Sequence, residues 1–189
     1  MAIAGRAAAE LGYELVDEQL PVVVAKRLDV SPEDAEAAED TRRSVGERML
    51  SSLERATPEL AVPALGATFH EQYLAEVRAA VLEYAARGNV FIVGRGASAI
   101  LGRRADVLRV FMHAPRAWRI ERIAEAHGID PKQAGLEVDR VDAARRAHLY
   151  DTFDLAFGDP HIYDLCIDTA SFGEAGSVAS IIAAVRARE

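Results

Sequence analysis

An arginine stands between two glycines at the end of an apolar run. The run, NVFIVGRGASAIL over residues 89–101, passes from β-branched and aromatic residues to Gly94, Arg95 and Gly96, and then to small and apolar residues. This pattern is typical of a buried strand that ends in a tight turn. In open α/β sheets, ligands bind beyond the carboxyl ends of the strands. The planar fork of Arg95 suits a phosphate or carboxylate there, although an arginine that simply reaches solvent fits the same pattern.

Further arginines recur at helical spacing in two later segments. In APRAWRIERI, Arg119 and Arg122 are three apart and are expected on one helical face. In VDRVDAARRAHLYDTF, Asp142 and Arg145 are also three apart, so they can pair within one helix. Solvated ion pairs would account for either segment alone. Both segments beside a strand-end arginine favour phosphoryl transfer, because the charge on the transferred group must be neutralised.

Short apolar runs alternate with helical stretches along the chain. This alternation predicts an α/β fold in which helices wrap a parallel sheet. The predicted strands are Tyr13–Asp17, Val90–Gly94, Val107–His113 and Tyr163–Thr169. The predicted helices are Ala4–Leu11, Glu18–Leu28, His70–Arg87, Arg116–Ala126, Pro131–Tyr150 and Gly173–Arg188. Residues 31–68 break the rhythm and are interpreted as a helical insertion between the first two strands.

Composition excludes several classes of function. The 22 basic and 30 acidic residues leave a net charge of −8, which argues against broad nucleic-acid binding. The five histidines do not occur at metal-ligand spacing, so no metal site is predicted. Cys166 is the only cysteine, and its apolar surroundings predict a core position. With no signal peptide and no apolar stretch of about 18 residues, a soluble cytoplasmic protein without a membrane partner is expected.

Five segments together resemble one known family. LGYELVDEQL, GNVFIVGRGASAIL, LRVFMHAPRAWRIERI, VDRVDAARRAHLY and YDLCIDT occur in this order and look like the cytidylate kinase-like family, a branch of the P-loop nucleoside monophosphate kinases. The resemblance implies one domain with a three-layer parallel sheet and helices on both faces. It also implies that residues 31–68 are an acceptor-binding insertion, that residues 115–150 are a lid, and that ATP and Mg²⁺ are the cofactors. Small-molecule nucleotides would be the partners, and the oligomeric state stays open.

The resemblance also assigns roles to the acceptor side. Arg95 is similar to the strand-end arginine that grips the phosphate of the acceptor nucleotide. Asp17 resembles the acid that opens onto the acceptor site. Asp142 resembles the acid in the second half of the lid, and Arg140 falls in the same segment. Many cytidylate kinases carry an acid just before the strand-end Gly-Arg, whereas this chain has Val93, which weakens the case for cytosine specificity.

On the donor side, the resemblance points to three arginines. Arg119 and Arg122 look like the arginines at the start of the lid that face the donor phosphates. Arg145 resembles the lid arginine that meets the transferred phosphoryl group. These three residues are the predicted catalytic residues.

The beginning of the chain departs from the family. Relatives begin with a buried strand and a glycine-rich loop that cradles the donor phosphates at a helix N-terminus. Here Met1–Arg6 aligns with the helix after that loop. The central strand is therefore expected to be missing, and the strands that end at Gly94 and His113 would flank a vacancy. Either the sequence is incomplete, or the chain is a degenerate relative; by itself it is expected to be nearly inactive.

Three functions remain open at this point. The first is a kinase that, in its full-length form, transfers the γ-phosphoryl group of ATP to CMP or dCMP. The second is a non-catalytic nucleotide-binding or regulatory relative. The third is a small-molecule kinase of the shikimate or gluconate type, which shares the fold and the lid but not the acceptor.

Overall fold

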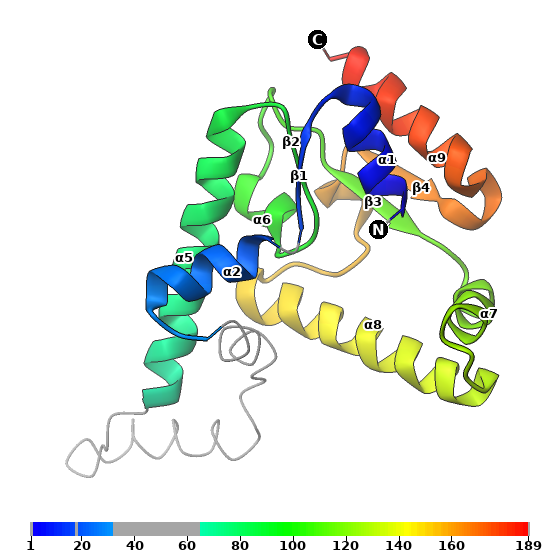
Figure 1. The fold of residues 1–189 in the computed structure, drawn as a ribbon, viewed down its shortest axis with the longest axis horizontal. Coiled ribbons are helices and arrows are strands. Elements are labelled where there is room, and N and C mark those ends of the chain that lie inside the picture. Colours follow the sequence, from blue (N-terminus) through cyan, green and yellow to red (C-terminus); the bar gives the residue numbers. More distant parts are fainter. Residues whose placement is uncertain (1, 18, 32–64, 189) are drawn as a thin grey trace. The chain divides into compact units, whose positions relative to one another are not determined.

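The computed structural model describes residues 2–17, 19–31 and 65–188 (Figure 1). The chain forms two compact units, of which one joins Met1–Leu15 to Gly88–Glu189 and the other is Val16–Arg87. Most of the predicted insertion, residues 32–64, lies outside the described residues.

The unit Val16–Arg87 is built on two helices, α2 (Gln19–Leu28) and α5 (Leu65–Arg87), which pack against each other. Leu20 and Val24 of α2 are buried, as expected for apolar residues four apart on one helical face. At the exposed edge of this helix pair, Arg27 of α2 forms an ion pair with Glu83 of α5, with Nη2 2.6 Å from Oε2. Helix α5 ends as its sequence predicts, because Gly88 follows it with a φ of 71°.

The larger unit contains the remaining elements. Its helices are α1 (Ala2–Leu11), α6 (Ala97–Leu101), α7 (Arg116–His127), α8 (Pro131–Phe153), the 3₁₀ helix η2 (Pro160–Ile162) and α9 (Thr169–Arg186). Its strands are β2 (Val90–Ile92), β3 (Val110–His113) and β4 (Leu165–Asp168), with β1 (Glu14–Val16) at the unit boundary. No helix in the described part of the chain is long and apolar enough to cross a membrane.

The strands form two separate pairs. β1 pairs with β2, and β3 pairs in parallel with β4, so that Val110 lies opposite Leu165 and His113 opposite Asp168. Within the described residues, no ladder joins β2 to β3. The fold is therefore mixed α/β with small sheets, where the resemblance implied one continuous sheet of several strands.

The core of the larger unit lies between α1, α9 and one face of the β3–β4 pair. Helices α1 and α9 lie side by side (Figure 1). Ala7 of α1 and Ile181 of α9 are fully buried, and they form one apolar cluster with Ile167 of β4. Since neighbouring residues of a strand face opposite sides, Cys166 points away from this cluster and is exposed. The prediction that Cys166 is a core residue is wrong.

The opposite face of the β3–β4 pair carries aromatic rings. Phe111 stacks on Tyr163 at a centroid distance of 4.8 Å and meets Phe157 edge to face at 5.5 Å. These contacts tie β3 to the segment between α8 and β4.

A partly buried ion pair joins the segments that lead into β3 and β4. The side chain of Arg109 is only 5% exposed, and it donates two hydrogen bonds to Asp164, from Nη2 at 2.8 Å and from Nε at 3.1 Å. The backbone N–H of Arg109 donates to the same carboxylate at 2.9 Å. These hydrogen bonds hold the pKa of Asp164 well below its usual value. Arg188, beyond α9, lies 3.4 Å from the same carboxylate.

The α7–α8 pair forms a helical hairpin. Helix α7 ends at Gly128, whose φ is 63°, and α8 begins with Asp130 as its N-cap, accepting a hydrogen bond from the Lys132 N–H at 2.8 Å. Pro131 occupies the first turn of α8, where a missing N–H costs nothing. This hairpin contains the segment interpreted as a lid.

Candidate functional site

The turn after β2 has a left-handed backbone. The Ala97 N–H donates to the Gly94 carbonyl at 3.0 Å, and the two residues between them, Arg95 and Gly96, have φ values of 54° and 65°. Positive φ at both central positions is the signature of a type I′ turn. For an L residue such as Arg95, this conformation costs about 1–2 kcal/mol. Strain of this kind clusters at functional sites, so it supports a binding role for Arg95.

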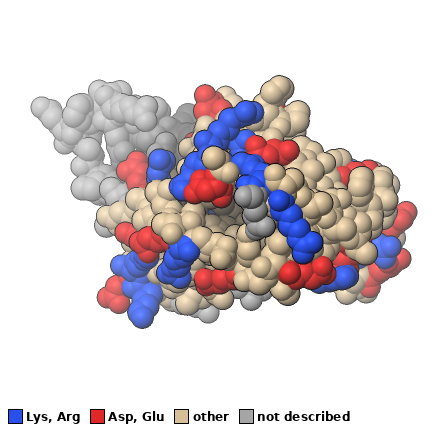
Figure 2. Space-filling view, turned by 90° about the horizontal axis from the view of Figure 1, so that it is seen from above, with Lys and Arg blue, Asp and Glu red and all other residues tan. Residues whose placement is uncertain are grey.

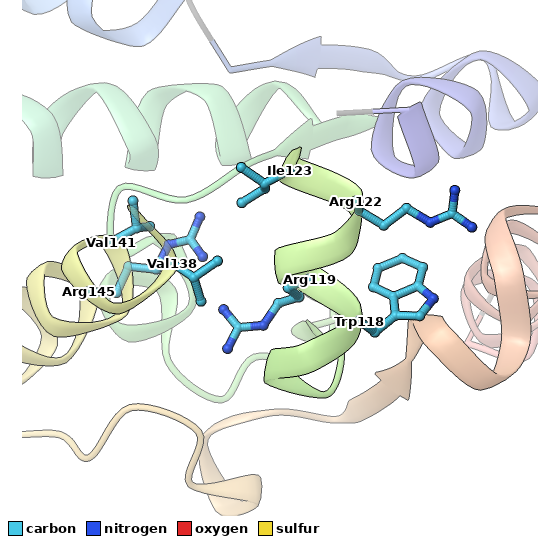
Figure 3. A pocket seen from close by; sticks show the side chains of 7 residues that line it. All are labelled: Trp118, Arg119, Arg122, Ile123, Val138, Val141 and Arg145. Carbon is cyan, nitrogen blue, oxygen red and sulfur yellow. The ribbon is translucent and has the colours of Figure 1, made fainter. Parts of the chain in front are cut away.

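The α7–α8 hairpin holds the other arginines around one pocket of about 250 Å³. Apolar side chains from both helices form most of its wall, and three arginines complete the lining (Figure 3). The lining residues are Trp118, Arg119, Arg122, Ile123, Val138, Val141 and Arg145. The structure thus brings the three predicted catalytic arginines to a shared pocket.

Arg119 is clamped between the two helices. Its Nη1 and Nη2 donate to the two oxygens of Asp142 at 2.8 and 2.7 Å, and its Nε donates to the Ala114 carbonyl at 3.1 Å. Asp142 therefore pairs across the hairpin with Arg119, and not within α8 with Arg145, the pairing that the spacing allows. One turn away, Arg116 and Asp139 repeat the arrangement at 2.7 Å in a more exposed position.

The ion pair of Arg119 and Asp142 keeps both side chains charged. The hydrogen bonds from Arg119 lower the pKa of Asp142, and the charges of Arg145 and Arg146 act in the same direction. Asp142 is therefore an anion at neutral pH, able to accept hydrogen bonds but not to supply a proton. The same pair raises the pKa of Arg119, which stays a cation.

Arg122 has a different environment from Arg119. Its guanidinium lies over the Trp118 ring, 5.3 Å from the centroid, and 3.2 Å from Glu125. Figure 3 shows Arg119 and Arg145 on the side of α7 that faces α8, with Arg122 and Trp118 on the other side. Both residues line the pocket, but their charged ends point apart, so the guanidinium groups do not share one helical face as their spacing predicts.

Comparison with known proteins identifies the family. The model of the cytidylate kinase-like family matches residues 1–171. The chain belongs to the cytidylate kinase-like family. It is 31% identical over 119 residues to a cytidylate kinase of Pyrococcus horikoshii, which covers 63% of this chain and 61% of that protein. A cytidylate kinase of Methanocaldococcus jannaschii is 30% identical over 110 residues, covering 57% of this chain and 61% of that protein. The chain thus matches about three fifths of the length of these relatives.

A solved structure has a similar fold. The crystal structure of an uncharacterized protein from Eubacterium ventriosum superimposes with a TM-score of 0.67 over 97% of this chain and 89% of that chain. The two sequences are 18% identical, so this likeness concerns the fold alone.

Among the predicted acceptor residues, Asp142 pairs with Arg119 of the pocket, and the others have different environments. Arg95 is half-buried in the turn after β2, and Arg140 is exposed on α8; neither lines the pocket. Asp17 belongs to the unit Val16–Arg87, and its Oδ2 is buried with no hydrogen-bond partner among the described residues. An orphaned carboxylate oxygen of this kind is costly, so it suits a residue whose partner is a ligand.

Sequence analysis missed two features of the site. Phe153 packs directly on Gly96, a contact that no spacing along the chain reveals, although the second glycine of GRG signals a close approach. The apolar wall of the pocket, Val138 and Val141, reads in the sequence only as the buried face of a helix. In the described part of the chain, no group of three or more His, Cys, Asp or Glu side chains could hold a metal ion.

On the face shown in Figure 2, basic and acidic side chains lie next to one another. Among the described residues, this face therefore carries no broad basic patch, as expected for a chain with a net charge of −8.

Proposed function

We propose that the complete protein is a nucleoside monophosphate kinase that transfers the γ-phosphoryl group of ATP to CMP or dCMP. The observation that carries this proposal is the shared pocket of Arg119, Arg122 and Arg145 in a chain of the cytidylate kinase-like family. Small-molecule nucleotides are its proposed partners and the cytoplasm its proposed location.

The proposed reaction needs charge neutralisation more than covalent chemistry. An oxygen of the acceptor phosphate attacks the γ-phosphorus, the bond from that phosphorus to the bridging oxygen breaks, and ADP leaves. The arginines would balance the negative charge on the oxygens during the transfer. Arg145, which lines the pocket without the two-pronged bond that holds Arg119, is the residue best placed to move onto the transferred group.

The acceptor side of the proposal rests on Arg95 and Asp17. The strained turn holds Arg95 at the end of β2, where its fork can grip a phosphate with two hydrogen bonds. The buried oxygen of Asp17 suits a donor on the acceptor nucleotide. Asp142 and Arg140 are the proposed further acceptor contacts on α8.

The proposal includes the three-layer P-loop fold of the family. Its support is that neither β2 nor β3 has a second strand partner among the described residues, so a parallel strand could lie between them. Mg²⁺ would come with ATP, bound by its phosphates and by at most one or two carboxylates of the protein, since no group of three or more His, Cys, Asp or Glu side chains gathers among the described residues. No step is assigned to the ion.

A coupled assay of ADP release tests the proposal. The 189-residue chain and a protein expressed from a reading frame extended upstream of Met1 are compared with CMP, dCMP, UMP, AMP, shikimate and gluconate. We expect turnover of CMP or dCMP by the extended protein. Turnover of shikimate or gluconate alone would move the assignment to a small-molecule kinase, and a folded extended protein inactive with every acceptor would end the kinase proposal.

The clamp on Arg119 favours a second candidate, a nucleotide-binding relative without catalysis. Because Arg119 already donates from all three of its nitrogens, donor phosphates must compete with Asp142. Calorimetric titration with CMP and with ATP distinguishes the two. Binding of CMP without ATP binding, in the extended protein, would favour the non-catalytic relative.

A further inference from the structure

The ring of Phe153 lies against the backbone of Gly96. A Cβ atom at position 96 would be 2.7 Å from Cζ of Phe153, closer than real Cβ contacts come. At Gly94, which has a similar φ of 72°, a Cβ atom would meet nothing within 4 Å. Two features therefore favour glycine at position 96. The backbone there has a positive φ of 65°, and the ring of Phe153 leaves no room for a Cβ atom.

The ring is held at the end of a helix. Phe153 is the last residue of α8, and the next residue, Asp154, closes the helix with a φ of 54° and hydrogen bonds from its N–H to the carbonyls of Leu149 and Tyr150. His148, one turn earlier, meets the ring edge to face at a centroid distance of 5.9 Å. Phe153 is thus a fixed feature of α8, not a side chain that happens to lie near the turn.

The contact joins two groups of candidate site residues. Helix α8 carries Asp142 and Arg145 of the hairpin pocket, and the turn carries Arg95 between Gly94 and Gly96. Arg95 is in a conformation that an L residue leaves unless its neighbours prevent it. The ring of Phe153 occupies the space next to Gly96 on one side of this turn.

We propose that Phe153 is a positioning residue that holds Arg95 in its phosphate-binding direction by packing on Gly96. The inference rests on the proposed function, since it assigns Arg95 to the acceptor phosphate. Without the ring, the turn relaxes, the Arg95 side chain leaves its direction, and the two-pronged grip on a phosphate is lost. Phe153 itself touches neither the nucleotide nor the transferred group.

A first experiment follows Arg95 with no ligand present. The Nε–H signal of the Arg95 side chain is identified by nuclear magnetic resonance through its loss in Arg95→Lys, and its order is measured by the heteronuclear Overhauser effect. We expect an ordered signal in the wild-type chain and a mobile one in Phe153→Ala. Phe157→Ala is the matched control, because it removes a half-buried ring that packs on Phe111 instead of Gly96.

A second experiment measures the dissociation constant of CMP by calorimetry. We expect Phe153→Ala and Gly96→Ala to weaken binding about 10-fold, because misplacement of a binding group by about 1 Å is enough for such a loss. Phe157→Ala and Gly128→Ala should leave the constant within about twofold, since Gly128 has the same kind of φ, 63°, with nothing within 4 Å. In the Phe153→Ala background, Gly96→Ala should weaken binding less than it does in the wild type, because the ring is gone and only the φ of 65° still opposes the new side chain.

The outcomes separate the two proposals. If the wild-type chain does not bind CMP, the acceptor assignment fails, and the signal of Arg95 alone decides whether Phe153 orders the turn. If Arg95→Ala abolishes CMP binding while Phe153→Ala binds like the wild type with an ordered Arg95 signal, the positioning role is overturned and the acceptor assignment stands. Phe153→Leu, which keeps apolar volume without a flat ring, gives the same comparison if the alanine variant does not fold.

Discussion

Arg119 of α7 and Asp142 of α8 face each other in a two-pronged ion pair, with Nη1 2.8 Å from Oδ1 and Nη2 2.7 Å from Oδ2. The side chains are 29% and 16% exposed, so water screens this pair less than it screens the pair of Arg116 and Asp139, whose side chains are 54% and 55% exposed. The two pairs lie one turn apart on the same hairpin. They therefore form a natural comparison between a partly buried and an exposed interaction.

Asp142→Asn should destabilise the hairpin. The substitution removes the charge that Arg119 faces and leaves a partly buried cation with weaker partners, at a cost of about 1–2 kcal/mol in the free energy of unfolding. Asp139→Asn is the control and should cost less than about 0.5 kcal/mol, because exposed ion pairs contribute little. Urea unfolding monitored by circular dichroism measures both. Equal losses in the two variants would mean that burial does not distinguish the pairs.

Stability should fall in acid because of Asp164. The two hydrogen bonds from the Arg109 guanidinium hold the pKa of Asp164 well below its usual value. The unfolded chain takes up this proton near pH 4, whereas the folded chain takes it up only at lower pH. The pair therefore stabilises fully above about pH 5, and this contribution is lost as the pH falls towards the folded pKa.

Asp164→Asn tests this pH dependence. At pH 7 we expect a loss of about 2–3 kcal/mol in the free energy of unfolding, because the buried Arg109 loses its counter-charge. Below pH 4 the variant should lose less additional stability than the wild type. Asp106→Asn, which breaks the exposed pair with Arg104, should change the acid dependence less than Asp164→Asn, because solvent screens this pair. A series of urea titrations from pH 7 to pH 3 gives these slopes, and parallel slopes for wild type and Asp164→Asn would contradict the assignment.

Two substitutions of Arg95 distinguish the backbone strain of the turn from the role of the side chain in binding. Arg95→Gly removes the cost of a left-handed L residue, whereas Arg95→Ala keeps it. We expect Arg95→Gly to be more stable than Arg95→Ala by about 0.5–1 kcal/mol, after allowance for the greater chain entropy of glycine. Thermal unfolding measures the difference. Both variants should lose CMP binding, and an alanine variant as stable as the glycine variant would show that the turn had relaxed.

Arg145→Ala should reduce turnover without loss of fold. In the extended protein we expect kcat to fall about 10²–10³-fold, as when one charge-stabilising donor is removed from other active sites. The melting temperature should change little, because Arg145 is exposed and holds no two-pronged ion pair in the described structure. Arg186→Ala, at the exposed end of α9, is the matched control. A kcat unchanged in Arg145→Ala would remove this residue from the proposed reaction.

The helices of the hairpin were the most predictable part of the fold. Proline at the first turn and glycine after the last turn mark α8 and α7, and the predicted starts, Arg116 and Pro131, are confirmed. Helix α8 runs three residues beyond its predicted end, to Phe153, whose ring packs on Gly96, a residue distant in the sequence. The short helix α6 was not predicted, because five residues are too few to show the hydrophobic periodicity of a helix.

Element ends near side-chain contacts were the least predictable. The strand predicted from Val107 begins at Val110, because the N–H of Arg109 donates to the side chain of Asp164 instead of to a neighbouring strand. Helix α9 begins at Thr169, before its predicted start, because Asp168 caps it by accepting from the Ala170 N–H at 3.0 Å. Gly173, with a φ of 64° and a ψ of −178°, bends the helix where it had been expected to begin.

For the site, spacing predicted the residues but not their partners. The three-residue interval puts Arg119 and Arg122 on one helix, yet the partner of Arg119 depends on how α7 and α8 align. Only that alignment brings Asp142, 23 residues later, within hydrogen-bond reach. The role of Asp17 stays a prediction, and so do the roles of Arg95 and Arg140.

The outward position of Cys166 has a practical consequence. With one thiol in 189 residues, a maleimide dye would attach at a single known place on β4, without removal of other cysteines. The same accessibility exposes the protein to air oxidation, and two chains joined through their sulfur atoms would run at twice the mass on a gel without reductant. Samples for the titrations above therefore need a reducing agent throughout purification.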